Sequence, residues 1–108
     1  MTMTQKLVAE FVGTLMLLAT VVGSGIMGET LAAGNDAVAL WGNTAATGAI
    51  LVVLIMIFGP FSGAHFNPAV TLVFFAKGQL TRTEAAAYIA TQIVAGVAGV
   101  MLAHAMFD

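Results

Sequence analysis

The longest segment without a charged residue, residues 37–76, sets the strongest limit on how this 108-residue chain can fold. As one continuous helix it would be roughly 60 Å long, whereas the hydrocarbon core of a bilayer is about 30 Å thick. Two shorter uncharged segments, residues 11–28 and 85–107, each suit a single membrane-spanning helix. Charged residues make up 7% of the chain, against about a quarter in soluble domains. We therefore predict a membrane protein in which the long segment turns within the bilayer.

The composition also excludes several other classes of protein. With 60% apolar residues, the chain is too hydrophobic to be intrinsically disordered. Three basic residues provide no electrostatic surface for nucleic acid, so no nucleic-acid partner is expected. The absence of cysteine excludes a disulfide scaffold and a thiolate metal site.

Three dipeptides mark the place where the long segment turns: Gly59-Pro60, Ser62-Gly63 and Asn67-Pro68. Each is a turn or loop signal. They predict a spanning helix over about residues 40–58, an irregular re-entrant loop over residues 59–67 and a short helix over residues 68–77, which Gly78 ends. The short helix would be roughly 15 Å long, so it can reach only halfway across a bilayer. Irregular backbone at that depth is tolerated only where it is buried in protein or lines a cavity.

Two further spans complete a single domain over residues 1–108. One covers about residues 7–27. The other covers about residues 83–107, where Thr81 and Glu84 have the spacing of a capping box. The expected fold is therefore an all-α membrane protein with three transmembrane helices and one re-entrant half-helix.

The charged residues predict how these helices are oriented. The basic residues would lie on one side of the membrane and three acidic residues on the other: Lys6, Lys77 and Arg82 against Glu29, Asp36 and Asp108. Basic residues favour the cytoplasmic side. The N-terminus is therefore expected to be cytoplasmic.

The triplet Asn67-Pro68-Ala69 stands where the half-helix begins. Asn is a preferred N-cap residue and Pro is favoured at the first helical position, so the triplet can be simply a helix start. Alternatively, a half-helix that begins near the bilayer midplane directs its free N–H groups and positive dipole end at a cavity. Such donors orient a neutral polar solute and repel protons and cations. The residues alone leave both interpretations open.

Three motifs resemble those of the major intrinsic protein family, the aquaporins and aquaglyceroporins. Residues Ser62–Thr71, with the sequence SGAHFNPAVT, resemble the family's first signature loop, and Ala9–Thr14 resembles its first-helix motif. Residues Ala87–Gln92, followed by Gly96, resemble its third helix. The motifs occur in the family's order across essentially the whole chain. The flanking residues 48–51 and 58–60 look most like a bacterial branch associated with small neutral solutes and metalloids.

The resemblance implies a role for each matching position of the loop. Asn67, followed by Pro68 and Ala69, would donate a hydrogen bond to the permeating molecule. A ladder of backbone carbonyl acceptors would lead to it, formed by Gly63, Ala64, His65 and Phe66. The His65 side chain would line the pore, or the loop backbone would satisfy it.

The resemblance also implies that two polar residues inside predicted spans, Glu10 and Gln92, brace the loop. An ionisable residue inside a span is rare and by default functional. The alternative for Glu10 is a side chain that extends to the interface, because Lys6 lies one turn away. Gln92 is expected to form an interhelical hydrogen bond. No metal-ligand spacing connects Glu10 with His65 or His104.

Thr47 lies twenty positions before Asn67. The resemblance implies that the residue there lines the narrowest part of the pore, where water-selective members carry an aromatic side chain. A small hydroxyl residue implies a wider and more polar constriction. It favours glycerol-sized neutral solutes or undissociated metalloid acids.

A complete member of the family has two inverted repeats, and this chain resembles the first repeat only. It would be a fragment of a longer channel, or a natural half that pairs antiparallel with a second copy. The one-sided basic residues favour the fragment. The expected partners are the lipid bilayer, a second inverted repeat and, for complete channels, further copies in a homotetramer.

The expected function is a passive channel, or the N-terminal half of one, for water and small neutral solutes in a bacterial inner membrane. Neither enzymatic activity nor a cofactor is expected, because no nucleophile–base pair, paired carboxylates or metal-ligand set is recognisable. The alternative function is a non-conducting accessory membrane subunit, which would not need the half-helix at Asn67.

Overall fold

The computed structural model describes residues 2–107, which form four α-helices. Their bounds are α1 Met3–Leu31, α2 Asp36–Ser62, α3 Pro68–Ala76 and α4 Arg82–Phe107. None of the described residues belongs to a β-strand. Helices α1, α2 and α4 are long and apolar enough to cross a membrane. The predicted all-α membrane fold with three spans and one short helix is confirmed.

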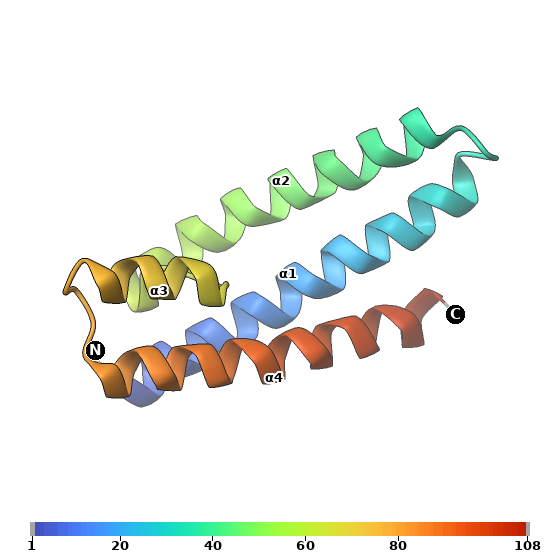
Figure 1. The fold of residues 1–108 in the computed structure, drawn as a ribbon. Coiled ribbons are helices and arrows are strands. Elements are labelled where there is room, and N and C mark those ends of the chain that lie inside the picture. The colour runs from blue at the N-terminus through green and yellow to red at the C-terminus, as the bar shows by residue number, and fades with distance from the viewer. Residues whose placement is uncertain (1, 108) are drawn as a thin grey trace.

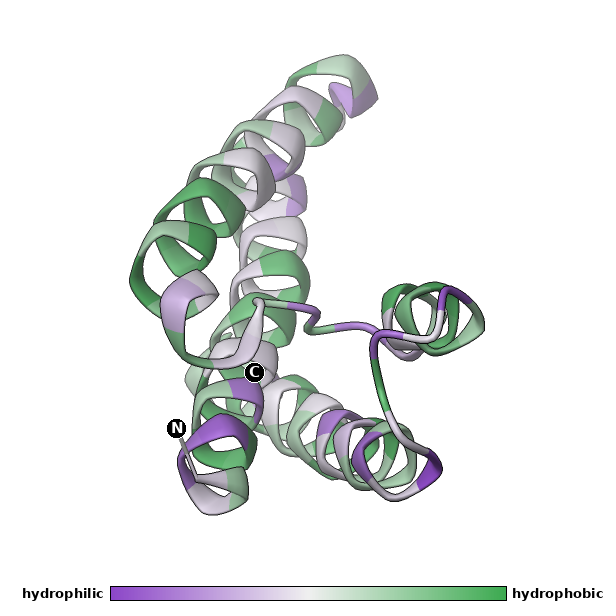
Figure 2. Ribbon diagram, turned by 90° about the vertical axis from the view of Figure 1, so that its left-hand side faces the viewer, coloured by the Kyte–Doolittle hydropathy of each residue, from purple (hydrophilic) through white to green (hydrophobic). Residues whose placement is uncertain are grey.

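Helix α1 occupies the middle of the arrangement and packs against both α2 and α4, while α3 packs against α4 (Figure 1). Within the described residues, the backbone of α2 lies close to neither α3 nor α4. Figure 2, which looks along the long helices, shows α3 standing apart from α2, with the connecting loop crossing between them. The molecule is elongated, with extents of 48 × 24 × 21 Å.

Side-chain caps determine where the helices begin. Thr2 and Gln5 form a capping box at α1, and Thr81 and Glu84 form the predicted one before α4. The Asn35 side chain accepts a hydrogen bond from the backbone N–H of Val38 at the start of α2. Each cap satisfies N–H groups that have no partner within their helix.

The predicted start of the re-entrant loop at Gly59 is wrong, because α2 continues through Pro60 to Ser62. Proline removes only one hydrogen-bond donor, and here it lies in the last turn of the helix. Continuing the helix pairs backbone groups that lipid cannot satisfy, and the N–H of Gly63 still donates to the carbonyl of Gly59 at 2.9 Å. The irregular backbone is therefore shorter than predicted and covers residues 63–67.

The other helix bounds differ from the predicted ones at the membrane surface. α1 begins before residue 7 and ends after residue 27, and α2 begins before residue 40. Uncharged segments define only the part of a helix that lies in hydrocarbon, whereas the helices continue through charged residues such as Lys6 and Glu29. Helix α3 ends at Ala76 and α4 begins at Arg82, each one residue from the prediction.

Helix α3 is re-entrant, because it returns to the end of the molecule at which α2 finishes (Figure 1). Its nine residues are roughly 14 Å long. The start of α1 and the α3–α4 connection lie at this same end, so the three basic residues do too, whereas Glu29 and Asp36 lie at the other. Asp108 lies outside the described residues.

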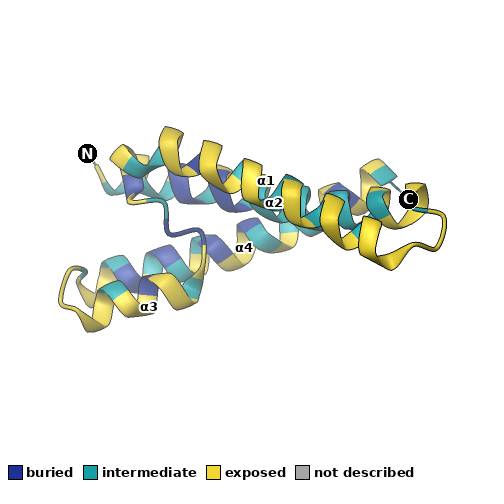
Figure 3. Cartoon of the chain, turned by 90° about the horizontal axis from the view of Figure 1, so that it is seen from above, coloured by how far each residue is buried: buried dark blue, intermediate teal, exposed yellow. Residues whose placement is uncertain are grey.

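The buried core is small and unusually polar. Figure 3 shows exposed residues along most of α2 and α3, with buried ones on α1, on α4 and in the segment joining α2 to α3. The largest fully buried side chains are Tyr88, Leu54, Gln92, Glu10, Thr14 and Thr71. Since buried polar groups are stable only when hydrogen-bonded, this core indicates a specific polar network.

Candidate functional site

Glu10 is the centre of the polar network. It is 0% exposed, and its carboxylate accepts four hydrogen bonds. Oε2 accepts from Ser62 Oγ at 2.6 Å and from the N–H of His65 at 3.1 Å. Oε1 accepts from the N–H of Phe66 at 2.9 Å and from Gln92 Nε2 at 2.7 Å. The carboxylate thus faces the loop rather than the membrane surface.

The loop backbone adopts a conformation that L-residues rarely take. Gly63, Ala64 and Phe66 have positive φ angles of 87°, 54° and 53°. For Ala64 and Phe66 this conformation costs energy, which the surrounding contacts must supply. The N–H of Ala64 donates to Ser62 Oγ at 3.1 Å, while those of His65 and Phe66 donate to Glu10. The loop conformation is therefore stabilised by hydrogen bonds that its own backbone N–H groups donate to Ser62 and Glu10.

The carbonyl oxygens of the same loop stay unpaired. Within residues 2–107, no hydrogen bond is accepted by the carbonyls of Gly63, Ala64, His65 or Phe66. His65 and Phe66 are buried, and buried backbone carbonyls are normally paired, so free acceptors beside a helix start are an uncommon feature. Chemically, the loop presents acceptors to any molecule that can donate hydrogen bonds.

Asn67 caps α3 with its oxygen and keeps its amide nitrogen free. Oδ1 accepts from the N–H of Ala69 at 2.7 Å, and Pro68 occupies the first turn, where its missing N–H costs nothing. Nδ2 has no partner among the described residues. Asn67 and Pro68 line a cavity of about 470 Å³ between α1 and α4. Donor groups and the positive dipole end of α3 therefore meet at this cavity.

His65 is buried rather than freely exposed. Its Nδ1 lies 3.0 Å from Thr71 Oγ1, which also accepts from Gln92 Nε2 at 3.0 Å. Its ring stacks on Phe74 with centroids 4.7 Å apart and lies against Tyr88 at 5.0 Å. The structure thus brings His65, Gln92 and Glu10 into one network. The His65 ring nitrogen Nδ1 is thus paired with Thr71 of α3, and the ring packs on Phe74 of α3 and Tyr88 of α4.

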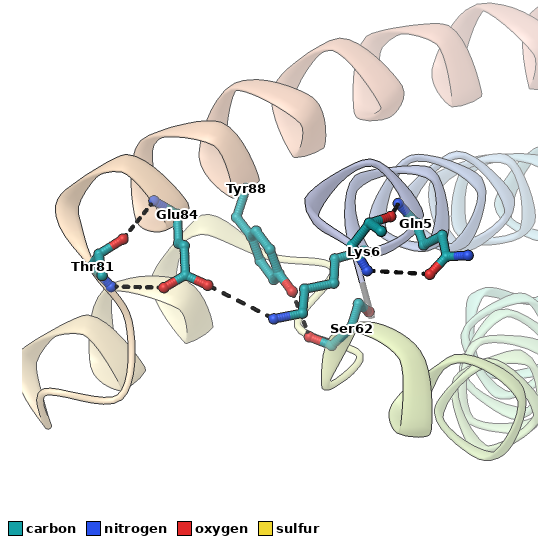
Figure 4. Close-up of polar contacts among 7 residues, drawn as sticks. Gln5, Lys6, Ser62, Thr81, Glu84 and Tyr88 are labelled. Carbon is teal, nitrogen blue, oxygen red and sulfur yellow. Dashed lines mark hydrogen bonds and ion pairs between the residues drawn. The ribbon is translucent and has the colours of Figure 1, made fainter.

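A hydrogen bond also joins the end of α2 to α4. The hydroxyl of Tyr88 donates to the carbonyl of Ser62 at 2.8 Å (Figure 4). Further out, Lys6 Nζ lies 3.8 Å from Glu84 Oε2, between the first turns of α1 and α4. Because Glu84 is partly exposed, that ion pair contributes little energy. The buried Tyr88 bond is the stronger support.

Phe66 fixes the loop against α1 from the apolar side. A Cβ atom built on Gly13 would overlap the Phe66 ring, so only glycine leaves room for it there. The ring also meets Phe58 edge-on at 6.2 Å. The first-helix motif therefore supplies both the acceptor and the space that the loop needs.

No individual role was assigned from the sequence to three residues of the polar network: Ser62, Thr71 and Tyr88. Thr71 is a hydroxyl in an otherwise apolar half-helix, and this could have marked it. Tyr88 precedes Gln92 by one turn on α4, so the two share a face. Ser62 begins the signature loop motif and forms part of a turn signal, neither of which indicates its hydrogen bond to Glu10.

Thr47 lies away from this network. It is half-buried on α2, and α2 does not approach α3 in the described residues. Its face of α2 also carries Asn43, which hydrogen-bonds to α1. Among residues 2–107, no three His, Cys, Asp or Glu side chains lie close enough to hold a metal ion.

Comparison with known proteins places these features in a family. The sequence model of the family described as 'Major intrinsic protein' matches residues 1–108. The chain is 59% identical to the aquaglyceroporin AqpS of Rhizobium meliloti (strain 1021) over 106 residues, covering 98% of this chain and 45% of AqpS.

Plant relatives show the same pattern. The chain is 37% identical over 95 residues to the probable aquaporin NIP5-1 of Arabidopsis thaliana, covering 88% of this chain and 30% of that protein. It is 35% identical over 106 residues to aquaporin PIP2-5 of Oryza sativa subsp. japonica, covering 91% and 38%. The chain thus spans less than half the length of these relatives. Its complete match shows that this integral membrane chain belongs to the major intrinsic protein family.

Proposed function

We propose that the chain forms one inverted repeat of a passive transmembrane channel for water and small neutral solutes. The observation that carries this proposal is that the N–H donors of the loop are paired within the protein while its carbonyl acceptors are not. Glu10 and Ser62 take its donors, which leaves the carbonyls of residues 63–66 and the Asn67 amide for a permeating molecule. A row of acceptors that ends at a donor suits molecules with hydroxyl groups or water.

The start of α3 is proposed to exclude cations and protons. Pro68 and Ala69 begin a helix whose positive dipole end faces the cavity that Asn67 lines. A positive dipole end raises the energy of a cation nearby, while a neutral solute is only oriented. His65 supports this site from behind through Thr71, rather than as a free side chain.

The solute class is proposed from Thr47. A small hydroxyl side chain leaves more room at the constriction than an aromatic ring, which favours glycerol or undissociated metalloid acids over strict selection for water. The name aquaglyceroporin carried by AqpS, at 59% identity, agrees with this class.

A second inverted repeat is required to close the pore, since one repeat leaves the cavity at Asn67 open on one side. The exposed apolar side chains of α2 and α3 are consistent with contacts to a partner repeat and to the lipid bilayer. Complete channels are proposed to form homotetramers in a bacterial plasma membrane, with the N-terminus in the cytoplasm.

Osmotic light scattering on proteoliposomes tests the function. One sample holds this chain alone. The other also holds the part of AqpS that the match leaves uncovered. We expect glycerol permeability above that of empty liposomes in the second sample, and a loss with Asn67→Asp, which keeps the capping oxygen but replaces the amide donors with a negative charge.

Permeability of the chain alone, if it depends on Asn67, would mean that two copies assemble antiparallel. Permeability that ignores the Asn67 change would contradict a pore at this site. No permeability in either sample, with the protein inserted and helical, would favour a non-conducting accessory subunit.

A further inference from the structure

The position of α2 depends on its contact with α1. Within the described residues, the backbone of α2 lies close to neither α3 nor α4, and its hydrogen bond to α4, from the Tyr88 hydroxyl to the carbonyl of Ser62, lies at its last residue. Most of its side chains are exposed (Figure 3). Near the loop, α2 is fastened by Ser62, which donates to Glu10 at 2.6 Å. The turn of residues 32–35 joins the outer end of α2 to α1, and the two helices pack along each other, but apolar packing alone leaves rotation about the helix axis weakly specified. A polar contact in the outer half would therefore help to fix how α2 is rotated.

Ser24 and Asn43 supply this contact, a second fastening of α2 to α1. Ser24 Oγ donates to Asn43 Oδ1 at 2.8 Å, a partly buried hydrogen bond. Among residues 2–107, it is the only side-chain hydrogen bond between α1 and α2 apart from Ser62 with Glu10. The helices are also close here, since a Cβ on Gly28 would lie 3.2 Å from the carbonyl oxygen of Ala39.

The fastening lies one turn from Thr47. Asn43 and Thr47 are four residues apart, so they share a face of α2, and both are half-buried. The two fastenings at Asn43 and Ser62 thus enclose the segment that carries Thr47. Rotation or tilt of α2 after loss of the outer fastening would move the Thr47 hydroxyl.

We infer that the Ser24–Asn43 hydrogen bond sets the position of Thr47, which makes Asn43 a positioning residue for solute selection. This inference rests on the proposed role of Thr47 at the constriction. Asn43 acts through the placement of α2 and needs no contact with the solute.

The distance between spin labels on α1 and α2 tests the inference directly. The chain has no cysteine, so labels can be attached at Met16→Cys, 41% exposed, and Gly48→Cys, where a Cβ meets open space. Asn43→Leu and Ser24→Ala should each shift or broaden the distance in lipid nanodiscs by about 1–2 Å, the size of helix displacements at interfaces. Thr44→Val, an exposed neighbour, is the matched control, and Ser24→Thr keeps the hydroxyl; both should leave the distance unchanged.

A solute readout separates positioning from simple stability. In proteoliposomes that conduct, Asn43→Leu should change the ratio of glycerol to water permeability by about threefold, the factor one interhelical hydrogen bond is worth on average, while Thr44→Val should not. Unchanged label distances would overturn the inference, as would a shifted distance with an unchanged ratio. If the unsubstituted protein does not conduct, the proposed function fails instead, and the label distances alone decide whether Ser24 and Asn43 place α2.

Discussion

The carboxylate of Glu10 holds Phe66, 56 residues later, in a left-handed backbone conformation: Oε1 accepts the Phe66 N–H at 2.9 Å, and φ is 53°. The adjacent N–H of His65 donates to the other carboxylate oxygen. With both donors directed at α1, the loop carbonyls remain available on its other side. A buried charge in the first helix thus determines which backbone groups the loop presents.

Glu10→Gln should destabilise the protein strongly. Glutamine has one acceptor oxygen, and its NH₂ group would face donors that now bind the carboxylate. Each donor left unpaired costs about 1–3 kcal/mol. Unfolding in detergent, followed by circular dichroism, measures the loss. Glu29→Gln, an exposed carboxylate on the same helix, is the control; equal effects of the two changes would contradict the bracing role.

Gly13→Ala should also destabilise the loop, because its methyl group would overlap the Phe66 ring. Overpacking of this kind costs about 1–3 kcal/mol. The matched change Gly42→Ala places a methyl group in open space and should stabilise the helix by about 0.5–1 kcal/mol. Denaturation midpoints of the two variants should therefore move in opposite directions. A Gly13→Ala protein as stable as the unsubstituted chain would show that Phe66 does not lie on Gly13.

The contact between α1 and α4 predicts different effects of substituting two glycines of α4. A Cβ on Gly99 would lie 2.5 Å from the carbonyl oxygen of Leu15 and 3.0 Å from Leu18 Cβ, whereas one on Gly96 would make ordinary contact with Leu18 at 3.8 Å. Gly99→Ala should therefore force the helices apart, and Gly96→Ala should be tolerated. Thermal unfolding in detergent distinguishes the two; similar losses would indicate a looser helix contact.

Tyr88→Phe should weaken the join between α2 and α4. The change removes the hydrogen bond to the carbonyl of Ser62 and leaves that buried acceptor unpaired. The expected loss of unfolding free energy is about 1–3 kcal/mol. Hydrogen exchange at the N–H groups of residues 63–66 measures whether the loop opens more often. Protection equal to that of the unsubstituted chain would show that Glu10 alone holds the loop.

The sequence predicted the helices well because two independent signals agree on them. Uncharged segments reveal spans, and the Asn67-Pro68 pair marks the half-helix start that the structure shows. Pro60 misled the prediction, since proline signals a break in water but was accommodated in the last turn of a helix. Where lipid offers no hydrogen bonds, the backbone favours helix over loop for as long as it can.

The candidate site was less accessible from sequence. The resemblance pointed to Glu10 and Asn67, but the hydroxyl of Thr71 became meaningful only when folding placed it between His65 and Gln92. The relation between Asn43 and Ser24 depends on the crossing of two helices, which no local pattern encodes. Pairwise contacts between distant residues are the part that required three-dimensional structure.

The orientation in the membrane is the last expectation open to a direct test. Single cysteines at Ala37, in the first turn of α2, and at Gln79, between α3 and α4, lie at opposite ends of the molecule and are both exposed. Because the basic residues gather at the end with Gln79, a membrane-impermeant maleimide should label Ala37→Cys in intact cells and Gln79→Cys only after permeabilisation. Substantial labelling of both in intact cells would show two orientations, and the chain would then be able to pair antiparallel with itself.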